Sequence, residues 1–258
     1  MKVVILAGGL GTRISEETIS KPKPMVEIGS KPILWHIMKI YSFWGYNEFI
    51  ICLGYKGSLI KEYFDNYFLF NSNLTIDLDH ERKIYHKAKK EKWKIHLVDT
   101  GEETKTGGRI KKIFNYVKDE KHFFLTYGDA VTNLNIPKTL KAHIKSKKLA
   151  TLTAVNPPPR FGNLILKKNN VVEFVEKSKD KSGLINGGFF VLCPKVVELI
   201  SNDNTVWEEE PLTNLAKKKQ LNAYIHRDFW QPMDTLFEKN LLNSLWNNNK
   251  APWKIWRE

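Results

Sequence analysis

The sequence is short of cysteine and contains no long hydrophobic run. Its 258 residues include two cysteines, Cys52 and Cys193, and neither belongs to a Cys-x-x-Cys pair. Both lie in apolar stretches, which predicts buried free thiols in a reducing compartment, without a disulfide framework or a zinc site. No apolar stretch reaches the ~20 residues of a membrane-spanning helix, and the first residues lack a signal-peptide pattern. We therefore expect a cytoplasmic protein that does not bind membranes.

Acidic residues are few compared with basic ones. The 41 Lys and Arg outnumber the 28 Asp and Glu, which gives a formal net charge of +13. Nucleic-acid-binding proteins often show such an excess, but no recognition helix, zinc finger or RNA-binding signature accompanies the basic clusters at 82–94, 138–148 and 217–219. We interpret the clusters as solvated faces and expect no nucleic-acid partner. The positive field would instead concentrate small anionic substrates.

The strongest local signal is a glycine-rich segment after a predicted strand. Residues 3–6 are a continuous apolar run, typical of a buried parallel strand. The glycines that follow allow backbone N–H groups to converge on an anion. Arg13 adds a planar fork of donors, and Lys23, held between two prolines, adds a second cation. We predict a polyphosphate site that includes Leu6, Ala7, Gly8, Gly9, Leu10, Gly11, Thr12, Arg13 and Lys23.

Two common phosphate-binding loops do not fit this segment. The Rossmann pattern requires a third glycine where Ile14 stands, and no glycine in the chain begins the Gly-x-x-x-x-Gly-Lys-Ser/Thr pattern of a P-loop. A simple turn with incidental basic residues is the structural alternative. The combination of Thr12, Arg13 and Lys23 makes that alternative the weaker interpretation.

Farther along the chain, strand and helix patterns alternate. Strands are predicted at 2–7, 48–53, 74–79, 93–98, 123–127, 150–155, 164–166, 171–175, 185–192 and 223–226. Helices are predicted at 32–44, 58–67, 110–117, 137–147, 194–200, 209–218 and 236–246. This order favours an α/β, Rossmann-like fold: a mixed, mostly parallel sheet with helices on both faces and a small β-rich insertion at 71–100. Ligands of such sheets bind beyond the carboxyl ends of the strands.

Two aspartates are candidates for binding a metal ion. Asp129 follows a predicted central strand and Gly128, and Asp234 lies just before the last predicted helix. Mg²⁺ needs only one or two protein carboxylates in addition to substrate phosphates. The structural alternatives are a turn for Asp129 and a helix N-cap for Asp234, a common place for aspartate.

These motifs together resemble the signature of the sugar-1-phosphate nucleotidyltransferases. Gly-Gly-x-Gly-Thr-Arg at 8–13 with Lys-Pro-Lys-Pro at 21–24, Gly128-Asp129, and Trp-Gln-Pro-Met-Asp-Thr at 230–235 spread this resemblance over nearly the whole chain. The resemblance implies that Asp129 and Asp234 hold Mg²⁺, and that Arg13, Lys23 and Asp129 are catalytic. It also implies one nucleotidyltransferase domain over 1–258, whose sugar-binding portion begins at about residue 156.

The resemblance also implies a sugar site in the second half of the chain. Glu176-Lys177 is similar to the family's Glu-Lys-Pro, with Ser178 in place of the proline. There the glutamate binds sugar hydroxyls and the lysine binds the sugar phosphate. Asn186-Gly187 is similar to the strand of the sugar pocket, where small residues let a pyranose lie against the backbone.

Within this family, several stretches resemble the cytidylyltransferases that act on glucose 1-phosphate. They include Val-Glu-Ile-Gly at 26–29, the segment 99–109, and Ala-Pro-Trp-Lys at 251–254. This resemblance implies CTP and α-D-glucose 1-phosphate as substrates, with Thr104 and Arg109 contacting the nucleotide. It further implies a homo-oligomer, a hexamer by analogy, that makes CDP-glucose for CDP-deoxysugars of surface polysaccharide (O-antigen).

Other interpretations stay open. A nucleotidyltransferase of different base or sugar specificity, using UTP or dTTP, is one. A metal-dependent glycosyltransferase is another, since Asp77-Leu78-Asp79 supplies an Asp-x-Asp sequence, although outward residues of an edge strand explain it more simply. A non-catalytic nucleotide-binding module would not need Arg13, Lys23 and both aspartates. The basic segment 80–92 fits a lid, an oligomer contact or a solvated hairpin equally well.

Overall fold

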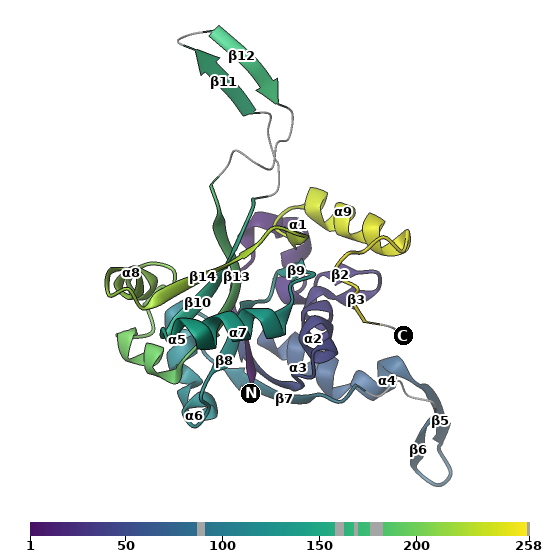
Figure 1. Cartoon of the computed structure of the whole chain (residues 1–258). Coiled ribbons are helices and arrows are strands. Elements are labelled where there is room, and N and C mark those ends of the chain that lie inside the picture. Colours follow the sequence, from purple (N-terminus) through teal and green to yellow (C-terminus); the bar gives the residue numbers. More distant parts are fainter. Residues whose placement is uncertain (87–90, 158–162, 168–169, 176–182, 257–258) are drawn as a thin grey trace.

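The computed structural model is built on a seven-stranded sheet (Figure 1). It describes residues 1–86, 91–157, 163–167, 170–175 and 183–256. β1 pairs in parallel with β4 and β8, and β13 is antiparallel to both β8 and β10. The mixed, mostly parallel sheet predicted from the sequence is confirmed. In spatial order its strands are β14 (Leu221–His226), β10 (Ala150–Val155), β13 (Ile185–Leu192), β8 (Phe123–Tyr127), β1 (Val3–Leu6), β4 (Glu48–Leu53) and β7 (Lys94–Asp99).

Helices cover both faces of the sheet, as expected. Along β1, Val3 and Ile5 belong to one hydrophobic cluster and Val4 and Leu6 to the other, because successive side chains of a strand point to opposite faces. The first cluster includes residues of α2 (Ile33–Phe43), α3 (Gly57–Asp65), α7 (Ile136–Ser146) and α9 (Leu236–Asn247). The second includes residues of α5 (Thr106–Lys112), α6 (Phe114–Val117), η3 (Pro194–Leu199) and α8 (Glu210–Lys217).

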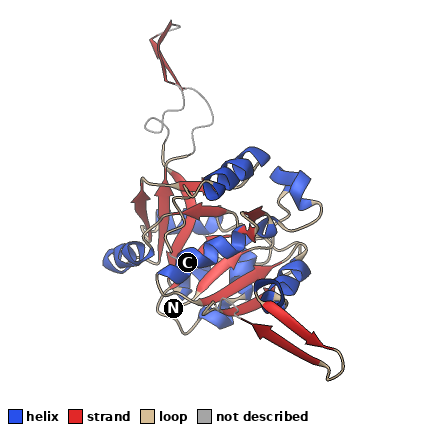
Figure 2. Cartoon of the chain, turned by 90° about the vertical axis from the view of Figure 1, so that its right-hand side faces the viewer, coloured by secondary structure: helices blue, strands red, loops and turns tan. Residues whose placement is uncertain are grey.

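Among the described residues, four two-stranded pairings lie outside the main sheet. They are β2 (Glu27–Ile28) with β3 (Lys31–Pro32), β5 (Asn73–Asp77) with β6 (Arg82–His86), β9 (Ala130–Thr132) with β15 (Trp230–Pro232), and β11 (Asn163–Lys167) with β12 (Asn170–Val175). The predicted insertion at 71–100 divides into two parts. Its last strand, β7, is the edge of the main sheet, whereas the hairpin β5–β6 projects from the body of the molecule in both views (Figures 1 and 2).

Several predicted helices differ in detail. The single helix expected at 58–67 is divided at Asn66 into α3 and α4 (Tyr67–Asn71), and the one at 110–117 is divided at Ile113 into α5 and α6. The segment 194–200 forms the 3-10 helix η3. Short helical turns follow the glycines of the loop: η1 (Thr12–Ile14), α1 (Ser15–Thr18) and η2 (Lys23–Met25). Among the described residues, no helix has both the length and the apolar composition needed to cross a bilayer.

Residues near the end of the chain pack on α2 around a buried histidine. The imidazole of His36 is fully buried among Trp35, Trp246, Trp253 and Trp256. Its Nε2 lies 2.8 Å from the Ile28 carbonyl oxygen, and the Trp253 indole donates a hydrogen bond to its Nδ1 (3.3 Å). Burial lowers the pKa of His36 to about 4, so the neutral ring is the form that stabilises this packing.

Candidate active site

A pocket of about 560 Å³ lies beyond the carboxyl ends of the parallel strands β1 and β8. The loops that follow these strands meet there because parallel strands end at the same edge of the sheet. The volume is in the usual range for small-molecule sites. The predicted residues that line it are Leu6, Ala7, Gly8, Gly9, Leu10, Gly11, Thr12, Arg13, Lys23, Thr104, Arg109, Gly128, Asp129 and Asn186.

The glycine loop needs glycine at two positions for different reasons. Gly11 has φ +67, in the left-handed region that other residues rarely adopt. At Gly8, an added Cβ would lie 2.2 Å from Nη1 of Arg109, so only glycine leaves room for the guanidinium group. The loop is therefore shaped both by its own backbone and by a side chain from α5.

Arg109 connects the loops that follow β1, β4 and β7. Its side chain is buried, and the guanidinium donates to Gly8 O (3.0 Å) and Leu53 O (2.9 Å) at the ends of the first two strands. It also donates to Thr100 Oγ1 (2.6 Å), Gly101 O (2.8 Å) and Glu102 O (3.0 Å) after β7. These bonds hold the pocket rim together. The predicted contact of Arg109 with the nucleotide stays a prediction.

Two cations and two carboxylates form one cluster at the pocket. Lys23 Nζ lies 2.6 Å from Asp129 Oδ2 and 2.5 Å from Asp234 Oδ1, and Arg13 Nη1 lies 2.6 Å from Asp234 Oδ2. The strands β9 and β15 explain how residues so distant in sequence meet. Asp129 directly precedes β9 and Asp234 follows β15, and the two strands pair antiparallel with Pro232 opposite Ala130. The Met233 N–H also donates to the Asp129 carbonyl (2.8 Å).

Asp234 is not the cap of the last helix. The N-cap of α9 is Thr235, whose side chain accepts from the Glu238 N–H, while Glu238 accepts from the N–H groups of Asp234 (2.7 Å) and Thr235 (3.1 Å). This capping box leaves the carboxylate of Asp234 for Lys23 and Arg13. The structural alternative considered for Asp234 is therefore wrong.

The environment keeps Lys23 charged. Its side chain is buried, and burial alone would lower the pKa of its ammonium group. Asp129 and Asp234 outweigh that effect and raise the pKa of Lys23 above its ordinary value. Arg13, by contrast, has a side chain that is 73% exposed and reaches into solvent at the pocket mouth. The cluster thus combines a fixed cation with an accessible one.

The donor set of the cluster fits Mg²⁺. Asp129 and Asp234 offer hard carboxylate oxygens, and one oxygen of each already lies within 2.6 Å of a single cationic nitrogen. Two carboxylates that share one ammonium group are placed to share a divalent ion, whose remaining positions water and phosphate oxygens would fill. Mg²⁺ at these residues remains a prediction.

Of the other predicted site residues, some lie in the pocket and some do not. Thr104 is buried in the pocket wall and accepts a hydrogen bond from Lys112 Nζ (3.1 Å). Gly187 is outside the pocket lining, and its carbonyl accepts from the Trp230 indole (2.8 Å). Glu176 and Lys177 lie outside the described residues.

Tyr127 and Glu208 are among the pocket residues that sequence reasoning missed. The Tyr127 hydroxyl donates to Glu208 Oε1, and the Thr106 hydroxyl donates to Glu208 Oε2 (2.6 Å). Burial and the Glu208 carboxylate raise the pKa of Tyr127, so its hydroxyl stays protonated. Tyr127 could have been found as the strand residue before Gly128-Asp129. Glu208, in an acidic run at 208–210, gave no local signal.

The Asp-x-Asp sequence lies elsewhere. Asp77 ends β5, and its carboxylate accepts from the N–H groups of Asp79 (3.1 Å) and His80 (3.1 Å). This pattern closes the turn of the projecting hairpin, and neither aspartate lines the pocket. A structural role explains the Asp-x-Asp motif. The glycosyltransferase interpretation therefore has no support from Asp77 and Asp79.

Known proteins are similar to this chain over nearly its whole length. A family model described as "Nucleotidyl transferase" matches residues 2–235. A glucose-1-phosphate cytidylyltransferase of Salmonella typhimurium is 57% identical over 256 residues, which is 99% of this chain and 100% of the relative. A probable glucose-1-phosphate cytidylyltransferase of Bacillus subtilis is 46% identical, with 99% and 100% covered.

Solved structures share the fold. The crystal structure of HddC from Yersinia pseudotuberculosis complexed with GMP-PN matches with a TM-score of 0.69 and 24% identity, covering 95% of this chain and 99% of that one. The inositol-1-phosphate CTP transferase of T. maritima matches with a TM-score of 0.64 and 14% identity, covering 99% and 98%.

Proposed function

The chain belongs to the nucleotidyl transferase family, and from this premise we propose that it transfers a cytidylyl group from CTP to α-D-glucose 1-phosphate. The products are CDP-glucose and pyrophosphate. The observation that carries the proposal is the cluster of Arg13, Lys23, Asp129 and Asp234 beside the glycine loop. The full-length likeness to glucose-1-phosphate cytidylyltransferases supports this substrate pair over UTP or dTTP.

The reaction is an in-line displacement at phosphorus. A phosphate oxygen of glucose 1-phosphate forms a bond to the α-phosphorus of CTP, while the bond from that phosphorus to the bridging oxygen breaks and pyrophosphate leaves. The attacking phosphate is already anionic near neutral pH, so no protein nucleophile is required. Catalysis then depends on positioning and on neutralising charge.

The glycine loop and the residues of the cluster have separate roles in the reaction. The backbone N–H groups of the glycine loop bind phosphate oxygens, and the exposed guanidinium of Arg13 binds the oxygens that become pyrophosphate. Lys23, which contacts both carboxylates in the free chain, stabilises negative charge on the reacting phosphates. Mg²⁺ held by Asp129 and Asp234 would supply further charge neutralisation when bound.

Pyrophosphate release tests the proposal. The purified chain is incubated with glucose 1-phosphate, Mg²⁺ and each of CTP, UTP, dTTP, ATP and GTP, with an EDTA control and re-addition of Mg²⁺. We expect release with CTP, loss of release with EDTA, and recovery when Mg²⁺ is restored. Release with another nucleotide alone would overturn the cytidylyl assignment but keep the reaction class. No release with any pair, including other sugar phosphates, would overturn both.

We further propose that this cytoplasmic enzyme works as a homo-oligomer and supplies CDP-glucose for deoxysugars of surface polysaccharide. Support for the assembly comes from large apolar side chains exposed on α4 and the hairpin β5–β6. Phe70 is 62% exposed and Ile76 is 55% exposed. Light scattering coupled to size-exclusion chromatography gives the mass. We expect a multimer that Phe70→Lys weakens, and a monomeric wild-type chain would overturn the proposal.

A further inference from the structure

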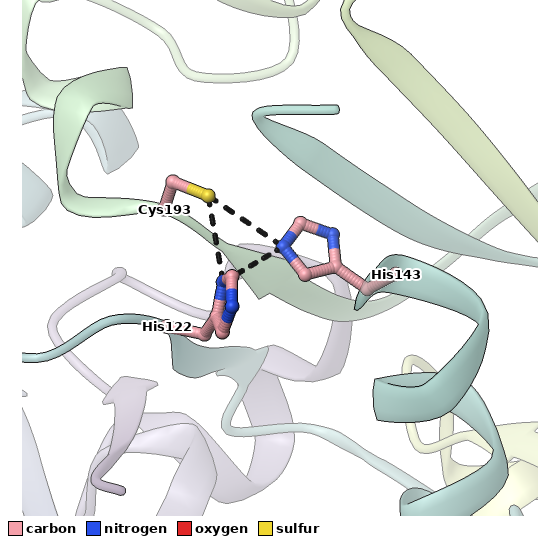
Figure 3. Close-up of side chains that lie close together, drawn as sticks. All are labelled: His122, His143 and Cys193. Carbon is pink, nitrogen blue, oxygen red and sulfur yellow. Dashed lines mark hydrogen bonds between the residues drawn. The ribbon is translucent and has the colours of Figure 1, made fainter. Parts of the chain in front are cut away.

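Two histidines and a cysteine converge at the end of β8 that is farthest from Asp129 (Figure 3). His122 directly precedes β8, Cys193 directly follows β13, and His143 belongs to α7. In the antiparallel pairing of β13 with β8, Leu192 lies opposite Phe123, so His122 and Cys193 are neighbours at the same edge. The helix α7 adds the third side chain from the face of the sheet.

The three potential ligand atoms face one another. His143 Nε2 lies 3.1 Å from His122 Nδ1, and Cys193 Sγ lies 3.4 Å from His122 Nδ1 and 3.7 Å from His143 Nε2. In tetrahedral zinc coordination, bond lengths of ~2.05 Å to nitrogen and ~2.3 Å to sulfur place two nitrogens ~3.3 Å apart and a nitrogen and a sulfur ~3.6 Å apart. The three separations thus match one face of a zinc tetrahedron to within a few tenths of an ångström.

The surroundings favour the metal-binding form of the two histidines, whereas the cysteine must lose a proton. Burial lowers the pKa of His143 to about 4, and it also lowers the pKa of His122, so both rings are neutral at physiological pH. Burial raises the pKa of the Cys193 thiol, so its proton would leave only when a metal binds. Nδ1 of His143 lies 2.9 Å from Thr151 Oγ1. With its proton on Nδ1, the ring donates to that hydroxyl and directs the Nε2 lone pair at the cluster.

We propose that His122, His143 and Cys193 bind one Zn²⁺ ion, with water in the fourth position. Imidazole and thiolate are ligands that zinc prefers, whereas the carboxylates of Asp129 and Asp234 suit Mg²⁺. The ion ties α7 to the ends of β8 and β13. It lies outside the pocket, so the cytidylyl reaction does not need it. This proposal departs from our sequence-based expectation that the cysteines form no zinc site, and the experiments below decide between the two.

Cobalt spectroscopy tests the site directly. The chain is stripped of metal, held in excess Mg²⁺ to satisfy the carboxylates, and titrated with Co²⁺. We expect a thiolate-to-cobalt charge-transfer band and intense visible bands of four-coordinate cobalt, saturating at one ion per chain. Zn²⁺ should then bleach these bands by displacing Co²⁺. Absence of the charge-transfer band in the wild-type chain would overturn the proposal.

Variants assign the ligands. Cys193→Ala should remove the charge-transfer band, and His122→Asn should weaken cobalt binding at least ~10-fold while keeping a thiolate ligand. Cys52→Ala is the matched control, because Cys52 is a free cysteine that is fully buried in β4 and does not belong to the cluster. It should bind as the wild type does. An unchanged spectrum in Cys193→Ala would overturn the assignment.

A second measurement guards against variants that fail to fold. Zn²⁺ should raise the melting temperature of the wild-type chain and of Cys52→Ala, since a ligand that binds only the folded state stabilises it. It should leave Cys193→Ala unchanged. Thr151→Val, which removes the partner of His143 Nδ1 but no ligand, should reduce zinc affinity by about 10-fold. An equal rise in melting temperature in Cys193→Ala would show that zinc acts elsewhere.

Discussion

The two ends of β8 differ in the chemistry that they hold. At its carboxyl end, Asp129 meets Asp234 and Lys23, a cluster of oxygen ligands and ammonium charge beside an open pocket. At its amino end, His122 meets His143 and Cys193, a nitrogen and sulfur cluster away from that pocket. One five-residue strand thus separates a site suited to a hard cation and phosphates from a site suited to zinc. The type of ligand, more than position on the sheet, distinguishes the two functions.

Removing the central cation of the carboxyl end should have the largest effect. Lys23→Ala leaves Asp129 and Asp234 without their shared partner and removes a preorganised charge from the reacting phosphates. We expect kcat to fall by roughly 10² to 10³, or about 3 to 4 kcal/mol in the barrier. Pyrophosphate release measures it. Lys21→Ala, two residues earlier in a partly exposed ion pair with Glu27, is the control and should keep its rate. Near-full turnover by Lys23→Ala would contradict the role.

A change at the second carboxylate should alter the dependence on metal. Asp234→Asn keeps the size of the side chain but removes the charge that faces Arg13 and Lys23. We expect about a 10²-fold lower rate and a higher Mg²⁺ concentration for half-maximal activity. Asp228→Asn, an exposed aspartate six positions earlier, serves as the control. A lower rate with an unchanged Mg²⁺ requirement would argue that Asp234 only positions the two cations.

The hydrogen bonds that hold the pocket rim together can be weakened without changing the charges of the cluster at Asp129 and Asp234. Arg109→Lys keeps the positive charge but cannot reproduce the fork of donors to Gly8, Leu53 and the loop after β7. Buried carbonyls left without partners should lower the free energy of unfolding by about 2 kcal/mol. Urea denaturation measures this, with Arg82→Lys on the exposed strand β6 as control. Equal stability of both variants would mean that the buried bonds are replaceable.

The smallest expected effect is a loss of folding stability at acidic pH, caused by the buried imidazole of His36. The pKa of His36 is about 4 in the folded chain and about 6.5 when unfolded, so the unfolded state binds more protons between these values. Stability is therefore full above pH 6.5 and is lost as the pH falls toward 4. From pH 7.5 to 5.5 the expected loss is about 1 kcal/mol. Denaturation curves of the wild type and His36→Gln compare the slopes, and identical slopes would contradict the assignment.

The sequence predicted the cluster of side chains at the carboxyl end of β8 much better than the cluster at its amino end. A strand followed by glycines, Arg13 and Lys23 is a local pattern, and Asp129 lies directly after a strand, so both were visible in short windows. The pairing of Asp234 with Asp129 depends on β9 and β15 and was predicted through resemblance alone. His122 and Cys193 are 71 residues apart and meet only because β13 runs antiparallel to β8. Neither periodicity nor motif spacing encodes that direction.

Several elements and one site residue differ from the sequence-based predictions. β7 has the alternating pattern of an exposed hairpin strand, yet it pairs with β4 and completes the main sheet. The breaks at Asn66 and Ile113 interrupt continuous helical patterns without a proline or glycine to mark them. Glu208 reaches the pocket through hydrogen bonds to Tyr127 and Thr106, residues of other elements. For β7 and for Glu208, the deciding partner is distant in the chain.

If Mg²⁺ binds at Asp129 and Asp234 as predicted, the ammonium group between them should make the binding of the metal ion and the binding of the nucleotide depend on each other. A divalent ion that takes these carboxylates must displace Lys23, whose buried charge then needs new acceptors. The triphosphate supplies such acceptors at the same place. Cation and nucleotide should accordingly bind with positive heterotropic cooperativity, each raising the affinity of the chain for the other by the same factor. A divalent ion alone would meet carboxylates already neutralised by Lys23, so we expect the free protein to bind such an ion more weakly than the nucleotide complex does.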